Sequence, residues 1–249
     1  MKRSTNIIKF LPSLLFSLLL IGLWEFAGRQ EWLPKFIIPL PSEIVQALGS
    51  DLPNLMHHAK YTFLQAFLGL VIGTLLGIIL AVFMDRLPWV KQTLYPLLIV
   101  LQTIPTIALA PVLLLWLGYD MLPKIVLIVI YAFFPVVINL LTGFSQVDRD
   151  ALRLVRLMGA TYWQELQHVK IPASLPYLFS ALRLNVSYAF ISSVVAEFLG
   201  GFKGLGVYMT QSKSVFAYDK MFAVILVITT ISLMSMAGLR WLERLVLKW

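Results

Sequence analysis

The chain has 249 residues, of which 59% are hydrophobic and only 13% are charged, and its mean hydropathy is +0.86. Soluble domains carry about 25% charged residues, so this composition excludes an ordinary soluble fold and indicates a membrane protein. The net charge of +8 does not indicate a nucleic-acid-binding protein, because the basic residues lie at the ends of apolar runs. The absence of cysteine excludes a disulfide framework.

Six apolar runs predict membrane-spanning helices. Crossing a hydrocarbon core about 30 Å thick takes roughly 20 apolar residues in a helix. In lipid only helices and closed barrels satisfy their own backbone hydrogen bonds, and these runs are too long and continuous for barrel strands. The first run resembles a secretory signal but lacks a small-residue cleavage site, so we expect it to remain as a span. The single domain, residues 1–249, is predicted to span at about 10–28, 60–84, 90–117, 122–143, 174–199 and 219–239.

The connections between the spans predict the orientation of the chain. The stretch after the first span is too interrupted to cross a membrane, and we expect it on the outer surface, with Ser42 as the N-cap of a short helix. Basic residues, among them Lys2, Arg3, Arg153 and Arg240, are more frequent on the side that holds both termini. The excess of basic residues marks the cytoplasmic side, so both termini are predicted to be cytoplasmic.

Small and polar residues inside the spans predict packing and a solute path. Gly69, Gly73 and Gly77 form a ridge of small residues that lets another helix approach closely. Prolines in the third and fourth spans kink or interrupt helices, and in a membrane such breaks persist where neighbours or a water-filled cavity satisfy the freed backbone groups. Hydrogen bonding between helices is the alternative role for the polar residues beside them. The candidate path comprises Gln102, Thr103, Pro105, Asn139, Tyr188 and Glu197.

The sequence holds no motif for catalysis, metal binding or ion coupling. It has no phosphate-binding loop of the G-x-x-x-x-G-K-[ST] type, and its histidines have no carboxylates or cysteines at metal-ligand spacing. The spans hold almost no ionisable residues at mid-depth, where ion-coupled transporters usually need them. We therefore expect no catalytic or metal site on this chain and an energy source outside it.

The segment "DRDALRLVRLMGATYWQELQHVKIPASLP" is polar between two apolar spans. Apolar residues at helical spacing predict a first short helix, and Gly159 stands where a helix end needs a positive φ. Thr161 begins a capping box with Gln164 at the start of a second helix. Pro172 and Pro176 are predicted to end that second helix before the fifth span.

This segment resembles the cytoplasmic coupling loop of permease subunits of ATP-binding cassette (ABC) importers. Gly159, Ala160, Ile171 and Pro172 match the family pattern, while residues 153–155 replace its E-A-A triplet. Three other stretches, "PLPSEI", "LQTIPTIALAPVLLLWLG" and "VVAEFLGGFKGLG", are similar to permeases for taurine, alkanesulfonates, nitrate and thiamine precursors. Residues 204–225 are most similar to the thiamine-precursor (hydroxymethylpyrimidine) members.

The resemblance implies an all-α type I importer membrane domain in a prokaryotic inner membrane, with six spans and a coupling loop at about 146–173. The implied partners are two ATPase subunits that carry ATP and Mg, an extracytoplasmic solute-binding protein and a second copy of this chain. The chain itself would be a transport subunit, not an enzyme, and would bind no cofactor. The residues implied in coupling to the ATPase are Arg153, Leu154, Arg156, Met158, Gly159, Ala160, Thr161, Tyr162 and Trp163.

The implied solute is small, and the resemblance favours a thiamine-precursor pyrimidine or a similar heterocycle. Aromatic residues available to stack on such a ring are Tyr131, Phe133, Phe134, Tyr188 and Phe190. Taurine, alkanesulfonates or nitrate are the alternative solutes. A secondary transporter independent of ATP is the alternative mechanism, and a membrane enzyme is a third reading.

Overall fold

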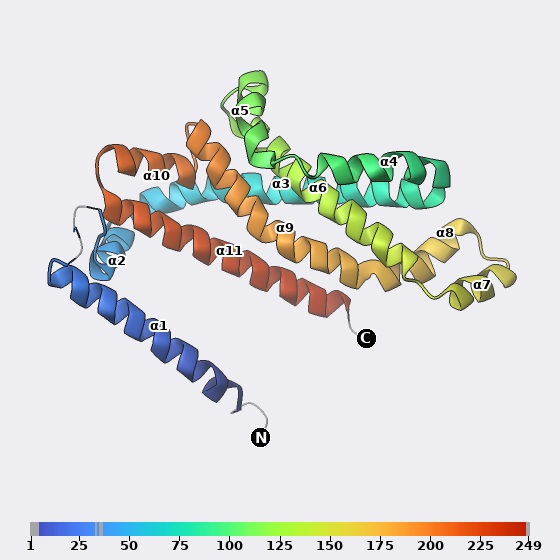
Figure 1. The fold of residues 1–249 in the computed structure, drawn as a ribbon, viewed down its shortest axis with the longest axis horizontal. Helices are drawn as coiled ribbons and strands as arrows, with labels where there is room; N and C mark the ends of the chain where they lie inside the picture. The colour runs from blue at the N-terminus through green and yellow to red at the C-terminus, as the bar shows by residue number, and fades with distance from the viewer. Residues whose placement is uncertain (1–4, 33, 35–36, 248–249) are drawn as a thin grey trace. The chain divides into compact units, whose positions relative to one another are not determined.

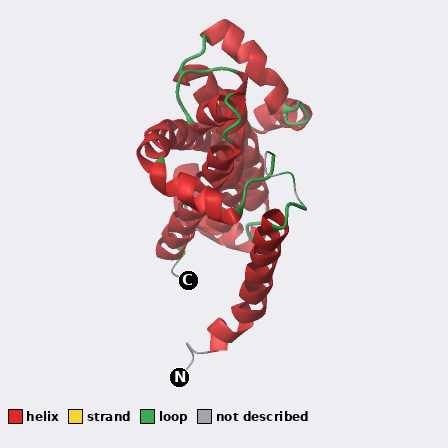
Figure 2. Cartoon of the chain, turned by 90° about the vertical axis from the view of Figure 1, so that its left-hand side faces the viewer, coloured by secondary structure: helices red, strands yellow, loops and turns green. Residues whose placement is uncertain are grey.

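The computed structural model describes residues 5–32, 34 and 37–247, and within them it contains helices joined by short loops and no strand (Figure 2). Lys2 and Arg3, on which the predicted orientation partly depends, lie outside the described residues. The helices, labelled in Figure 1, are α1 (Thr5–Arg29), α2 (Pro41–Ser50), α3 (Leu52–Arg86), α4 (Pro88–Leu101), α5 (Thr106–Leu117), α6 (Met121–Ser145), α7 (Arg149–Leu157), α8 (Tyr162–Glu165), a π-helical turn (Leu166–Lys170), α9 (Ile171–Leu199), α10 (Leu205–Ser214) and α11 (Tyr218–Val246).

The chain divides into two compact units, each considered separately. The first comprises Met1–His57 and Tyr208–Val227, and the second comprises His58–Val207 and Ile228–Trp249. In the first unit α2 begins two residues earlier than an N-cap at Ser42 requires: Leu40 is the N-cap and Pro41 is the first helical residue. Proline suits that position because its missing N–H needs no partner there. The Ser42 hydroxyl instead donates to the Glu25 carboxylate of α1 (2.9 Å).

Five helical stretches of the described chain are long and apolar enough to cross a membrane, and a shorter apolar helix accompanies them. The five are Leu11–Arg29, Leu52–Arg86, Met121–Ser145, Tyr162–Leu199 and Tyr218–Val246, and the shorter one is Ile107–Leu117. The region predicted as the third span, 90–117, consists of two helices, α4 and α5, so one of its prolines interrupts the helix.

The break between α4 and α5 has a local cause at Pro105. Proline has no N–H to continue the helical ladder, and it disfavours helical backbone at the residue before it. The chain closes α4 with tighter turns, in which Thr103 N–H donates to the Val100 carbonyl oxygen (3.0 Å) and Ile104 N–H to that of Leu101 (3.2 Å). Pro96 and Pro111 lie inside α4 and α5, so only one of these prolines separates two helices.

The predicted glycine ridge of α3 is confirmed as a close contact with α6 in the second unit. A Cβ at Gly73 would lie 2.8 Å from the Val129 carbonyl oxygen and 2.9 Å from the Ala132 Cβ, closer than real Cβ atoms approach. Gly69 and Gly77 meet other residues of α6 in the same way. Small residues at this spacing let two helix backbones approach closely in lipid.

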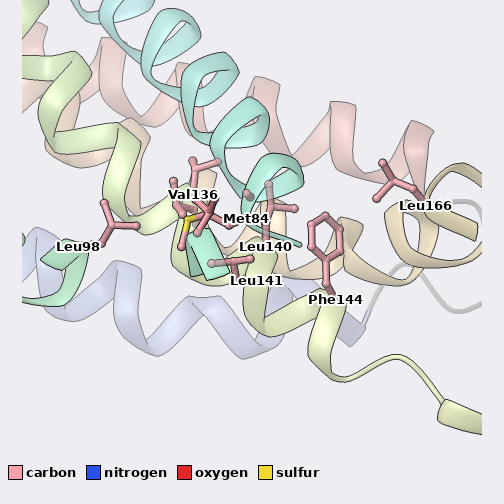
Figure 3. Packing of buried hydrophobic residues seen from close by; sticks show 11 residues of the cluster. Met84, Leu98, Val136, Leu140, Leu141, Phe144 and Leu166 are labelled. Carbon is pink, nitrogen blue, oxygen red and sulfur yellow. The ribbon is translucent and has the colours of Figure 1, made fainter. Parts of the chain in front are cut away.

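The apolar core of the second unit lies along α6 and extends toward the polar segment. It contains Met84, Leu98, Val136, Leu140, Leu141, Phe144 and Leu166, all labelled in Figure 3. Leu166 belongs to the π-helical turn and is 3% exposed. The core therefore anchors the N-terminal end of α9, from which α7 and α8 project beyond the end of α6 (Figure 1).

Candidate coupling and translocation sites

The predicted bend between α7 and α8 is confirmed, and its hydrogen bonds explain its geometry. Gly159 has a φ of +84°. Its N–H donates to the Arg156 carbonyl oxygen (3.0 Å), and the Ala160 N–H donates to that of Val155 (3.2 Å). This pair of bonds is the Schellman motif, which closes a helix with a left-handed residue, usually glycine. The Thr161 N–H then donates to the Gln164 side chain (2.7 Å), so the capping box of α8 is confirmed.

The prediction that Pro172 and Pro176 end the second helix is wrong. The chain passes from α8 through the π-helical turn directly into α9, with Pro172 in the first turn of α9 and Pro176 inside it. The π-helical turn closes with a wider bond, from the Ile171 N–H to the Leu166 carbonyl oxygen. A wider turn accommodates a residue that cannot donate a hydrogen bond. The polar segment is therefore continuous with α9.

Four apolar side chains of the polar segment are exposed and together form what we call the apolar ridge. Their exposed fractions are 60% for Leu154, 86% for Leu157, 79% for Met158 and 65% for Trp163. Contiguous exposed apolar groups mark a surface that contacts either a partner protein or the membrane. Leu157 is not among the predicted coupling residues, although its spacing from Leu154 and Met158 on α7 could have identified it.

Tyr162 is not part of the apolar ridge, although its ring lies 5.4 Å, centre to centre, from that of Trp163. Its side chain is half-buried, and its hydroxyl donates to the Asp85 carboxylate at the end of α3 (3.0 Å). The Arg86 guanidinium lies 4.8 Å from the centre of the Tyr162 ring, in the position of a cation–π contact. Tyr162 thus holds α8 against α3.

The predicted coupling arginines have different surroundings. Arg156 donates two hydrogen bonds to the Glu165 carboxylate, at 2.7 and 2.9 Å, and this carboxylate raises the pKa of Arg156 above its usual value. Arg153 is exposed and pairs with the exposed Asp150 at 3.3 Å. Exposed pairs of this kind contribute little to stability, so the Arg153 guanidinium is available to a partner.

Three charged residues of this region, Asp85, Glu165 and Lys170, were not identified from the sequence. The Lys170 ammonium lies 2.7 Å from the Asp85 carboxylate and 3.3 Å from that of Glu165. Glu165 and Lys170 are buried. Buried charges need partners, so their position beside apolar spans was a signal of pairing, but it did not say which residues pair.

The candidate path residues lie in several places in the second unit. Gln102 lines a cavity of about 240 Å³, bounded also by Leu101, Ile104, Leu109, Ile130, Tyr131, Phe134 and Pro135. Thr103 and Pro105 are exposed in the same break, whereas the Asn139 amide donates to the Pro135 carbonyl oxygen of its own helix (2.8 Å). The Tyr188 ring lies 4.8 Å from the Tyr131 ring, centre to centre. The structure thus brings Gln102, Tyr131 and Tyr188 to one region.

Glu197 lies apart from that cavity, buried at the end of α9 with 2% exposure. Its carboxylate accepts hydrogen bonds from the Thr62 hydroxyl (2.8 Å), the Gly206 N–H (2.6 Å) and the Gln65 amide. The Thr62 hydroxyl also accepts from the Leu205 N–H (2.8 Å). Glu197 therefore ties the glycine-rich turn between α9 and α10 to α3.

Comparison with known protein families identifies the family of this chain. Residues 73–248 match the family described as the binding-protein-dependent transport system inner membrane component. The chain belongs to this family. The permease is therefore an integral, multi-pass transport subunit of an ABC importer of type I, and not an enzyme.

Individual relatives and a solved structure agree with this assignment. The permease is 33% identical over 250 residues to the formylaminopyrimidine transport permease protein ThiX of Halalkalibacterium halodurans, covering 100% of this chain and 98% of ThiX. It is 30% identical over 238 residues to the taurine transport system permease protein TauC of Escherichia coli, covering 92% of this chain and 86% of TauC. A chain of the inward-facing MetNI methionine ABC transporter shares the fold, with a TM-score of 0.63 at 20% identity, over 78% of this chain and 95% of that chain.

Proposed function

We propose that residues 146–173 are the coupling segment of the permease, which binds an ATPase subunit and drives inward movement of a small solute by alternating access. The observation that carries this proposal is the apolar ridge, since Leu157 and Met158 are among the most exposed large apolar side chains described. An exposed ridge on a helix fits a hydrophobic groove on a partner. The bend at Gly159 sets the angle at which the ridge is presented.

The proposed assembly comprises two ATPase subunits, which bind ATP and Mg, an extracytoplasmic solute-binding protein and two copies of the permease. The family description as a binding-protein-dependent system supports the binding protein. The absence of a phosphate-binding loop from the sequence supports a separate ATPase. The assembly is proposed for a prokaryotic inner membrane, with both termini of the permease cytoplasmic.

Cysteine labelling tests the orientation and the docking surface together, since the sequence has no native cysteine. Gln46→Cys and Lys213→Cys, at exposed positions, are expected to react with an impermeant maleimide in intact cells. Gln167→Cys and Leu157→Cys are expected to react only in inside-out vesicles. Added ATPase subunit is expected to protect Leu157→Cys at least about tenfold, as for a residue at the centre of an interface. Labelling of Gln167→Cys in intact cells would contradict the orientation, and unprotected Leu157→Cys would contradict the docking surface.

We also propose that the solute is a thiamine-precursor pyrimidine or a similar small heterocycle. The likeness to ThiX supports this solute, and the likeness to TauC supports the alternative, a small sulfonate. The Tyr131–Tyr188 pair beside the cavity at the α4–α5 break favours a planar ring, because aromatic rings pack well on one another. The partner binding protein is expected to deliver such a ring to this region.

The solute prediction is tested by the ligand of the purified partner binding protein, identified by mass spectrometry and calorimetry. We expect a pyrimidine to bind and taurine to be ignored. Tyr188→Leu should then reduce pyrimidine import by about 3–10-fold, the range expected for one lost aromatic contact. Phe67→Leu, which removes an exposed ring on α3 outside the cavity, is the control and should import normally. Tight binding of taurine without pyrimidine binding would replace the heterocycle with a sulfonate.

A further inference from the structure

We propose that Arg156, Glu165, Lys170 and Asp85 form a charged link that transmits movement of the coupling segment to α3 as well as to α9. The inference rests on the proposed function, because it assigns a route to movement that begins at the ATPase. These four residues touch neither solute nor nucleotide in this proposal. They are positioning residues, which act by holding α7, α8 and α3 in one arrangement.

The link is a continuous series of opposite charges across four elements. Arg156 on α7 donates two hydrogen bonds to Glu165 at the end of α8, at 2.7 and 2.9 Å. Glu165 lies 3.3 Å from the Lys170 ammonium in the π-helical turn. Lys170 in turn donates to the Asp85 carboxylate at the end of α3 (2.7 Å). The series therefore runs from the coupling segment to α3. Its last contact joins Lys170 and Asp85, which are 85 residues apart along the chain.

The attachment of α7 makes this series mechanically important. The α7 helix has no buried residue, so core packing does not hold it in place. The bend at Gly159 and the two bonds from Arg156 to Glu165 connect it to α8. Through the backbone alone, a displacement of α7 and α8 would enter α9, with which α8 is continuous. The Lys170–Asp85 contact gives the same displacement a second route, into α3.

Burial keeps the part of the link formed by Glu165, Lys170 and Asp85 from being screened by solvent, whereas the Arg156 side chain is 59% exposed. The side chains are 10% exposed for Lys170, 13% for Asp85 and 5% for Glu165. Screening by salt is weak for buried pairs. The Tyr162 hydroxyl donates to the same Asp85 oxygen that Lys170 contacts, and the Lys170 ammonium lies 5.6 Å from the centre of the Tyr162 ring. The contacts of Asp85 are thus fixed in direction as well as in distance.

The choice of charged residues favours a positioning role over a purely stabilising one. Apolar residues of similar size often hold buried elements together as well as an ion pair does, because they avoid the cost of desolvating charges. A fully paired buried network of polar groups is rigid and specifies one relative position of the elements that it joins. Because α3 also packs against α6 through the glycine ridge, movement that enters α3 reaches the helix that lines the cavity at the α4–α5 break.

The test uses the complete reconstituted importer and measures solute imported per ATP hydrolysed. Asp85→Asn and Lys170→Gln are each expected to lower this ratio at least about fivefold, the lower end of typical coupling between sites. The amount of ATPase subunit that stays bound to the permease should be unchanged, because the apolar ridge is intact in both variants. The double variant should be no worse than either single variant, because residues that act through one contact are not additive.

Glu243→Gln is the matched control. It removes one partner of another ion pair between helices, Arg183 Nη1 of α9 with Glu243 of α11 (3.0 Å), that does not involve the coupling segment. The ratio of import to hydrolysis should be unchanged in this variant. If Asp85→Asn fails to fold, Arg156→Gln replaces it in the test and should also lower the import per ATP hydrolysed. This variant interrupts the series at its most exposed member and leaves Glu165 paired with Lys170.

The outcomes separate the link from the function on which it rests. An unchanged import ratio with normal ATPase retention would overturn the link alone, as would additive effects of Asp85→Asn and Lys170→Gln. A parental permease that retains no ATPase subunit would overturn the proposed function and the link with it. A reduced ratio in Asp85→Asn that Lys170→Gln does not worsen would support the link.

Discussion

Replacing Gly159 with valine is expected to leave the permease folded and inserted but to reduce solute import per ATP by about tenfold or more. Gly159 has a φ of +84°, and no atom lies within 4 Å of a Cβ built there. The penalty is therefore in the backbone, about 1–2 kcal/mol for an ordinary side chain in the left-handed region and more for a β-branched one. Such a cost is too small to unfold a domain of ordinary stability, but 1.4 kcal/mol is enough to change the population of the bend tenfold.

Two other variants make the Gly159 result specific to the bend. Gly118→Val carries the same backbone strain, since Gly118 has a φ of +86° with no atom within 4 Å of its Cβ, but lies between α5 and α6. The Gly118→Val permease should still bind the ATPase subunit, and the loaded binding protein should still stimulate ATP hydrolysis. Asparagine tolerates the left-handed region, so Gly159→Asn should keep most of the import activity. Normal import and normal ATPase stimulation in Gly159→Val would reject the role of the bend in coupling.

Replacing Glu197 with leucine is expected to destabilise the permease strongly. The carboxylate accepts from Thr62, Gln65 and the Gly206 N–H in a site where Glu197 is 2% exposed. Leucine has similar volume but accepts no hydrogen bond, so three hydrogen bonds are lost. The Gln65 amide keeps a bond to the Ser193 hydroxyl (2.6 Å), and a buried donor that finds no other acceptor costs about 1–3 kcal/mol. We expect a melting temperature in detergent lowered by roughly 10 °C or more, at the 2–4 °C per kcal/mol typical of a domain of this size.

The conformation of the glycine-rich turn depends on the same carboxylate. Gly204 has a φ of +124°, and a Cβ there would collide with the Glu197 carboxyl group. A Cβ at Gly206 would lie 2.5 Å from the Val194 carbonyl oxygen. The control is Asp120→Asn, which alters an exposed carboxyl group just before α6 and should melt like the parent. A Glu197→Leu variant that melts like the parent but no longer imports would assign Glu197 to the solute path instead of to the anchoring of this turn.

Local chemistry predicted much of this permease correctly. The Gly159 bend and the Thr161 capping box involve residues within a few positions of one another, so their hydrogen bonds follow from residue order. The glycine ridge of α3 follows from spacing along one helix. The apolar runs predicted the spans because helix length and bilayer thickness are both known. The run at 90–117 is the exception, because Pro96 and Pro111 lie inside helices whereas Pro105 separates α4 from α5.

Tertiary structure decided where the polar side chains point. Tyr162 belongs to the same short helix as Trp163, yet its hydroxyl reaches Asp85 while Trp163 remains exposed. Glu197 is near the end of a span, where the sequence allows either a solute path or a buried anchor, and contacts with Thr62 and Gln65 make it part of a buried network. The Lys170–Asp85 pair joins residues 85 positions apart. Sequence alone shows that a buried charge needs a partner, but the partner is selected by the packing that brings distant helix ends together.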